Sequence, residues 1–148
     1  ERADYLRYHA LHATLSTQWS GLSWFQPKLT MAGNLSWKKP DAFSATDNLL
    51  KNAYYSLTMD FYPISKLRLY ADFSQSVFEI AHSHYSVNSF LNAGLRYDFH
   101  PRWMVSADLS NLLNRKDYEV SLYQGANFQY YHVPLRGREF LVSLRFKY

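Results

Sequence analysis

The chain of 148 residues contains no cysteine, which excludes disulfide frameworks and thiol catalysis. No run of 18 apolar residues occurs, so a membrane-spanning helix is excluded. The 16 Lys and Arg residues are scattered, without the basic cluster expected of a nucleic-acid-binding protein. No nucleophile elbow, metal triad or closely spaced acidic pair on one strand face is found. We therefore expect neither an enzyme nor a bound cofactor, and no nucleic-acid partner.

Aromatic residues are abundant, by contrast, at 18% of the chain with 13 Tyr, 10 Phe and 4 Trp. Tyr and Trp combine an apolar ring with a polar tip, and they are favoured where one end is wet and the other apolar. Their excess fits the interfacial girdle of a membrane protein. A Tyr-rich binding surface is the alternative reading of the same composition.

Apolar and polar residues alternate in seven segments, which is typical of β-strands with one greasy and one polar face. The segments are 11–19, 29–37, 55–61, 67–73, 91–99, 103–109 and 140–148. Their polar faces carry charges that a packed core would not accept unpaired, whereas a water-filled or plugged lumen would. These charged residues are Arg68, Asp72, Arg96, Asp98, Asp108, Arg145 and Lys147.

Short connections at 21–27, 62–65 and 100–102 alternate with long polar ones at 38–51, 75–89 and around an extra hairpin between 118 and the last strand. This alternation is typical of an outer-membrane barrel with tight periplasmic turns and large outer loops. Rings stand beside the short turns, as an interfacial ring requires: Trp19, Phe61, Phe99, Trp103 and Tyr148. The sequence thus predicts an all-β protein, an antiparallel up-and-down transmembrane β-barrel in the bacterial outer membrane, in contact with lipid and lipopolysaccharide.

The last strand has the pattern with which such barrels close, its apolar face consisting of Phe140, Val142, Leu144, Phe146 and Tyr148. Seven strands are an odd number, and they would leave two unpaired edges in lipid. We therefore expect residues 1–148 to be the C-terminal segment of a larger barrel, without a plug domain. Two alternatives stay open. Residues 1–10 could supply half of an eighth strand of a small barrel, or the chain could be a soluble all-β binding module with a dry core.

Two segments resemble a known family. Residues 106–118, SADLSNLLNRKDY, resemble the penultimate-strand segment of TonB-dependent outer-membrane receptors, and residues 134–140, PLRGREF, look like the lead into their last strand. The version here is closest to barrels of the Bacteroidetes type, with the similarity spanning roughly residues 50–148. A departure is Ser143, where many closing strands have Gly.

The resemblance implies a barrel of about 22 strands around an N-terminal plug. Its implied activity is uptake of a scarce nutrient, such as an iron chelate, a cobalamin-like cofactor or an oligosaccharide. It implies as partners the rest of the barrel and its plug, the barrel assembly machinery, and an inner-membrane complex that supplies energy through an N-terminal segment.

Candidate site residues are few. His82 and His84 lie two apart and would share a face of an extended chain, but without a third ligand they make a weak metal site and we expect a solvated loop. Four rings in the last outer hairpin could stack on a sugar or another flat ligand, or could stiffen the hairpin through cross-strand pairs. They are Tyr123, Phe128, Tyr130 and Tyr131.

Overall fold

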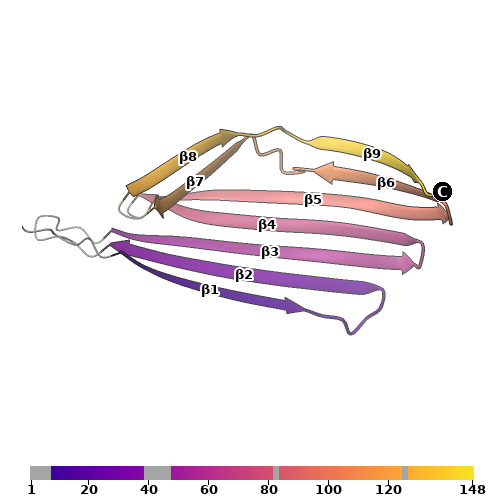
Figure 1. The fold of residues 1–148 in the computed structure, drawn as a ribbon, viewed down its shortest axis with the longest axis horizontal. Coiled ribbons are helices and arrows are strands. Elements are labelled where there is room, and N and C mark those ends of the chain that lie inside the picture. The colour runs from indigo at the N-terminus through magenta and orange to yellow at the C-terminus, as the bar shows by residue number, and fades with distance from the viewer. Residues whose placement is uncertain (1–7, 39–47, 82–83, 125–126) are drawn as a thin grey trace, which may run out of the picture.

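The computed structural model describes residues 8–38, 48–81, 84–124 and 127–148. Within them the chain forms nine strands, of which seven make one antiparallel sheet in the order β1-β2-β3-β4-β5-β6-β9 (Figure 1). These seven are β1 Tyr8–Gln18, β2 Phe25–Lys38, β3 Asn48–Ile64, β4 Leu67–Ala81, β5 His84–His100, β6 Trp103–Ser110 and β9 Glu139–Phe146. Strands β7 Asp117–Gln124 and β8 Asn127–Pro134 form a separate hairpin. The predicted all-β class and up-and-down order are confirmed.

The strand register places the predicted apolar positions of all seven strands on one face of the sheet. Residues directly opposite each other in neighbouring strands point to the same side. Cross-strand rows of apolar residues result, of which one is Leu29, Leu57, Phe73 and Leu91, with Thr17 of β1 at its end. The alternate positions form an equally continuous polar face.

Burial in this sheet is inverted relative to an ordinary globular domain. Among the described residues, Met104 is the one buried apolar side chain, while Ser36, Ser76, Glu79, Ser86, Asn88 and Asn111 are the buried polar ones. On the apolar face Leu144 is 63% exposed and Leu15 64%. No second layer of described chain covers that face, so the dry core of a sandwich is not formed there. No helix capable of crossing a bilayer is found in the described part of the chain.

The three short turns lie together at one end of the sheet, as predicted (Figure 1). Two of the long polar connections were predicted wrongly. Residues 75–81 extend β4 and 84–89 extend β5, in register through Val77 and Val87. Likewise β2 continues to Lys38 and β3 begins at Asn48, while 39–47 lie outside the described residues. The misleading feature is that polar and apolar residues are mixed on both faces here, which hides the period of two although the backbone pairing continues in register as far as Glu79 and Tyr85.

Aromatic rings cluster at the end of the sheet where the three short turns lie, which we call the turn end, and they include rings that were not predicted there. Trp24, in the β1–β2 turn, lies edge-on to Phe61 with 5.6 Å between ring centroids. Trp103 and Phe146 pair at 4.7 Å, and Phe146 contacts Tyr148 at 6.0 Å. The sheet itself is open, with β1 and β9 at its edges, so the described strands do not close into the predicted barrel.

Candidate functional site

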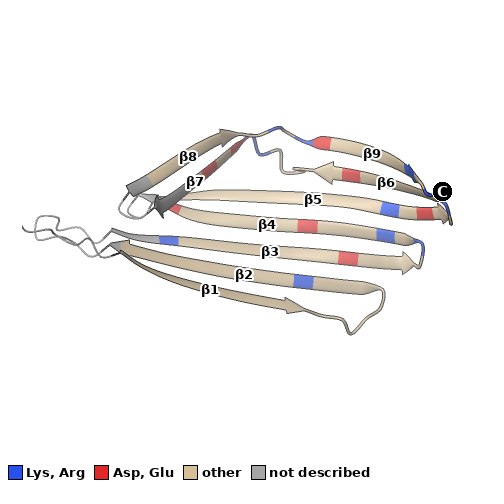
Figure 2. Ribbon diagram, viewed as in Figure 1, with Lys and Arg blue, Asp and Glu red and all other residues tan. Residues whose placement is uncertain are grey.

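Polar and charged side chains occupy the face of the sheet opposite the apolar one, and near the turn end they pair with one another. Arg68 on β4 donates to Asp60 on β3 at 2.7 Å. Tyr70 passes over Gly94 of β5 and donates to Asp108 on β6. Figure 2 shows most strand charges in this half of the sheet. Five of these charged residues line an open hollow of about 360 Å³: Arg68, Asp72, Arg96, Asp108 and Arg145.

The hairpin β7–β8 packs on the same polar face, toward the opposite end. Tyr118 of β7 lies edge-on to Phe78 at 6.3 Å and tilted against Phe90 at 6.1 Å. Both phenylalanines stand at polar-face positions, in register with Asn52 and Ser74. These ring contacts fix the side of the sheet on which β7 lies.

Asn88 of β5 holds the edge of β7 by two hydrogen bonds. Its Nδ2 donates to the carbonyl of Glu119 at 2.6 Å, and the Glu119 amide donates back to its Oδ1 at 3.2 Å. A carboxamide has the donor and acceptor pair of a peptide group, so Asn88 substitutes for a neighbouring strand. With 1% of its surface exposed, Asn88 is the most buried described side chain.

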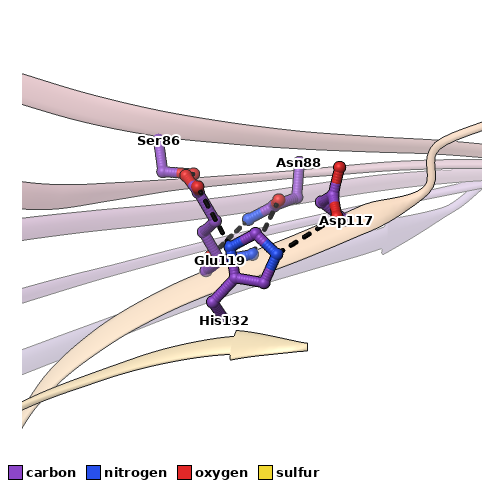
Figure 3. Close-up of polar contacts among 5 residues, drawn as sticks. All are labelled: Ser86, Asn88, Asp117, Glu119 and His132. Carbon is purple, nitrogen blue, oxygen red and sulfur yellow. Dashed lines mark hydrogen bonds and ion pairs between the residues drawn. The ribbon is translucent and has the colours of Figure 1, made fainter. Parts of the chain in front are cut away.

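The Glu119 carboxylate extends this attachment (Figure 3). Ser86 donates to it at 2.9 Å, and His132 of β8 lies 3.6 Å from it and 3.1 Å from Asp117. The hydrogen bond from Ser86, followed by one from Tyr130, lowers the pKa of Glu119 below its ordinary value. Desolvation, with the bond to Glu119, raises the pKa of Tyr130.

Between β7 and the sheet lies a cavity of about 400 Å³, which we call the hairpin cavity. Its floor follows two adjacent cross-strand rows of the polar face, and Tyr118 and Val120 of β7 supply a wall. The lining contains no Lys, Arg, Asp or Glu, and the full set is His12, Ala32, Gly33, Asn34, Asn52, Ala53, Tyr54, Ser76, Phe78, Tyr118 and Val120. Asn52 Oδ1 is buried and has no hydrogen-bond partner within the described chain.

The predicted rings of the hairpin are only partly brought together. Tyr130 and Tyr131 are adjacent on β8 and therefore point to opposite faces, Tyr130 toward Glu119 and Tyr131 donating to Gln129 at 2.6 Å. These two rings do not form one stacking platform. Tyr123 and Phe128 oppose each other in the hairpin, but their side chains lie outside the described part. Ligand contact by the four stays a prediction.

The two predicted histidines do not form a described pair, because His82 lies outside the described residues and His84 is exposed at the start of β5. Within the described ranges, no cluster of three His, Asp or Glu could hold a metal ion. On β9 the closing-strand residues face the same side as their β6 partners, Phe140 with Leu109 and Leu144 with Val105. Val142 and Phe146 lie on the same face of β9, and Tyr148, which follows the strand, is fully exposed.

The segments that carry the family resemblance contact each other where the chain leaves β6 and enters β9. Asn111 has a left-handed φ of 53°, and its Nδ2 donates to the carbonyls of Arg115 and Arg136 at 2.6 and 2.9 Å. Arg138 donates to the carbonyl of Leu112 at 2.9 Å. Side-chain to backbone bonds thus tie residues 111–115 to 136–138 and place β9 beside β6.

Sequence reasoning missed Asn88, Asn52 and Asn111. Asn88 lies in the segment 75–89, which the sequence predicted to be a polar loop, and Asn111 falls within the SNLLN segment. The chain matches no known family model, and it shows no significant similarity to any curated protein or solved structure.

Proposed function

We propose that this chain forms part of the wall of a transmembrane β-barrel in the bacterial outer membrane, in a TonB-dependent receptor that takes up a scarce nutrient. The observation that carries the proposal is the inverted burial. A continuous apolar face on seven strands is left uncovered, while the serine and asparagine side chains of Ser36, Ser76, Ser86 and Asn88 are buried on the other face. Lipid is the solvent that suits such a surface, since barrel strands alternate apolar outward and polar inward.

Strand lengths support the same arrangement. A tilted strand crosses a bilayer in about 9–11 residues, whereas β3 and β5 each have 17. The apolar face of β4 and β5 carries Phe73 and Leu91, but the next row toward the far end holds Gln75 and Ser89, hydrogen-bonded at 2.8 Å. The row beyond is apolar again, with Val77 opposite Val87, and the first charged residue on this face of β4, Glu79, follows one row further. The apolar band of β4 and β5 is therefore interrupted by a polar pair and reaches as far as Val77 and Val87. The aromatic cluster at the turn end supplies the opposite interface.

The open edges of the sheet favour a larger barrel. Unpaired backbone groups are not tolerated in hydrocarbon, so within a membrane β1 and β9 need further strands as partners. The contact between residues 111–115 and 136–138 gives the two family-like segments a common structural role, which supports the receptor assignment. On this proposal the polar face lines the lumen, and the hairpin β7–β8 packs against that lumen-facing side near the extracellular end, where it takes part in ligand selection.

A matched pair of substitutions on β9 tests the proposal. Leu144 faces the apolar side opposite Val105, and its neighbour Ser143 faces the polar side opposite Ser106. Leu144→Asp places a charge in lipid, so we expect reduced membrane assembly, whereas Ser143→Asp should be mild. The readout is the amount of folded protein in outer-membrane fractions. Equal tolerance of both substitutions would count against a lipid-facing Leu144.

A further inference from the structure

We propose that the hairpin cavity is a binding site for a neutral, hydroxyl-bearing ligand with the size and shape of a sugar ring. Its volume of about 400 Å³ lies within the range of small-molecule sites. The proposal deepens the proposed uptake function, because the cavity opens on the face that would line the lumen.

The chemistry of the floor indicates hydrogen bonding to a neutral partner. One cross-strand row contains His12, Asn34, Asn52 and Phe78, in direct register across four strands. The lining residues Asn34 and Asn52 are neighbours in this row and can both donate and accept. No Lys, Arg, Asp or Glu is present in the lining, so a cationic ligand would find no counter-ion, and an anionic one would find only His12 as a side chain able to carry the opposite charge.

Asn52 supplies the independent observation. Its Oδ1 is buried without a partner within the described chain, and an unpaired buried acceptor costs about 1–3 kcal/mol. A rotation of the Asn52 carboxamide toward the cavity that it lines would let a ligand hydroxyl donate to this oxygen and recover that energy. The acceptor therefore favours a donor-bearing ligand over a purely apolar one.

Three rings complete the site. Tyr54 and Phe78 rise from the floor and Tyr118 stands on the wall formed by β7. Tyr118 is held against the sheet by its contact with Phe78 and by the bonds of Asn88 to Glu119. Rings that converge with amides offer an apolar face and polar edges to the same molecule, which matches the two sides of a pyranose.

The test measures binding of defined probes to the protein in the phase from which it is recovered, detergent or buffer. The probes are the neutral sugars maltotriose, cellobiose and methyl galactoside, and the anionic glucuronate and galacturonate, followed by saturation-transfer NMR and titration calorimetry. We expect at least one neutral probe to bind and the uronates to bind at least tenfold more weakly. Binding of no neutral probe, or equal binding of the uronates, would overturn the proposal.

Asn52→Leu tests the site itself, with Gln75→Leu on the opposite face of the sheet as its matched control. Asn52→Leu removes the unpaired oxygen while keeping similar volume, so the melting temperature should hold or rise while affinity for the neutral probe falls at least tenfold. Gln75→Leu should leave affinity unchanged. Unchanged affinity in Asn52→Leu would show that the neutral probe binds outside the hairpin cavity and would overturn the proposal. Because these readouts are independent of membrane assembly, they separate failure of the site from failure of the proposed transporter.

Discussion

The Tyr70 ring lies directly over Gly94 of β5, and its hydroxyl donates to Asp108 on β6. A Cβ on Gly94 would lie 2.5–2.6 Å from Tyr70 atoms, much closer than packing permits. Gly33, on the apolar face of β2, has nothing within 4 Å of the same hypothetical atom. Gly94 is therefore required for the close approach of the Tyr70 ring to β5, whereas no such contact requires a glycine at position 33.

Gly94→Ala should therefore displace the Tyr70 ring and break its hydrogen bond to Asp108. We expect a loss of about 1–3 kcal/mol in the free energy of unfolding, the usual cost of overpacking. Gly33→Ala should be neutral or slightly stabilising, because it fills open space and stiffens the chain. Urea unfolding followed by Trp fluorescence measures both. A smaller loss for Gly94→Ala than for Gly33→Ala would contradict the observed close approach.

Asn111 combines a left-handed backbone with side-chain bonds that join two segments. Its Oδ1 accepts from the Arg115 amide at 2.9 Å, in addition to the two bonds donated by Nδ2. Asn114 shares the backbone conformation, with φ of 56°, but its side chain accepts only one long bond, from Arg138 at 3.4 Å.

Substitution by glycine separates these two contributions, because glycine keeps the left-handed φ and removes the side chain. Asn111→Gly should lower the free energy of unfolding by about 1–3 kcal/mol through lost hydrogen bonds. Asn111→Ala should cost about 1–2 kcal/mol more, because alanine resists this φ. Asn114→Gly is the control and should be nearly neutral in the same denaturation assay. Equal effects of the Asn111 and Asn114 glycine variants would argue against the joining role of Asn111.

At the scale of elements, an ionised Glu119 strengthens the attachment of β7–β8 to β5, in addition to the bonds that Asn88 makes with the Glu119 backbone. Because its pKa is lowered in the folded protein by Ser86 and Tyr130, ionisation stabilises the attached hairpin. That stabilisation is complete above the ordinary glutamate pKa, about 4.3, and is lost as pH falls through the lower folded value. We expect the hairpin to stay attached at neutral pH and to loosen only in acid.

Because the chain contains no cysteine, opening of the hairpin can be measured with a single introduced thiol. A single Val120→Cys variant places a thiol on the cavity wall, and its labelling rate by a neutral, pH-tolerant disulfide reagent reports hairpin opening. Labelling relative to a free thiol at the same pH should increase below about pH 4. Adding Ser86→Ala should move the onset upward, toward the ordinary glutamate value. A relative rate that does not depend on pH would remove Glu119 from this role.

The sequence predicted elements well where one face is apolar and badly where polar and apolar residues are mixed on both faces. All seven sheet strands were predicted because their halves near the short turns alternate clearly. The far halves of β4 and β5 were predicted as a loop, since Gln75 and Ser89 interrupt the apolar face before Val77 and Val87 continue it. The hairpin cavity was not predicted at all, because its rows join residues from four strands and the wall comes from a fifth element. Only the register brings Asn34, Asn52 and Phe78 into one row.

For the whole molecule, the uncovered apolar face predicts behaviour in fractionation. Rows such as Leu29, Leu57 and Phe73 offer a broad greasy surface, with further exposed residues including Leu11 and Leu15. Surfaces of this size mark contact with a membrane or partner. We expect the protein to stay with membranes through alkaline washing and to leave them only in detergent. A monomer that unfolds cooperatively without detergent would instead favour the soluble binding module.

The inverted burial also reverses which positions tolerate replacement. Acyl chains, the proposed neighbours of the apolar face, are fluid and adapt to any outline, so on this proposal exchanging Leu, Val, Ile and Phe across the apolar rows should leave no voids and cost little. Ser76, Ser86 and Asn88 are buried among other protein atoms. An added methyl group there would clash with packed neighbours, and a lost amide would leave hydrogen-bond partners unpaired. In this molecule, substitution of the small hydrophilic residues should therefore destabilise the fold more than substitution of the large apolar ones.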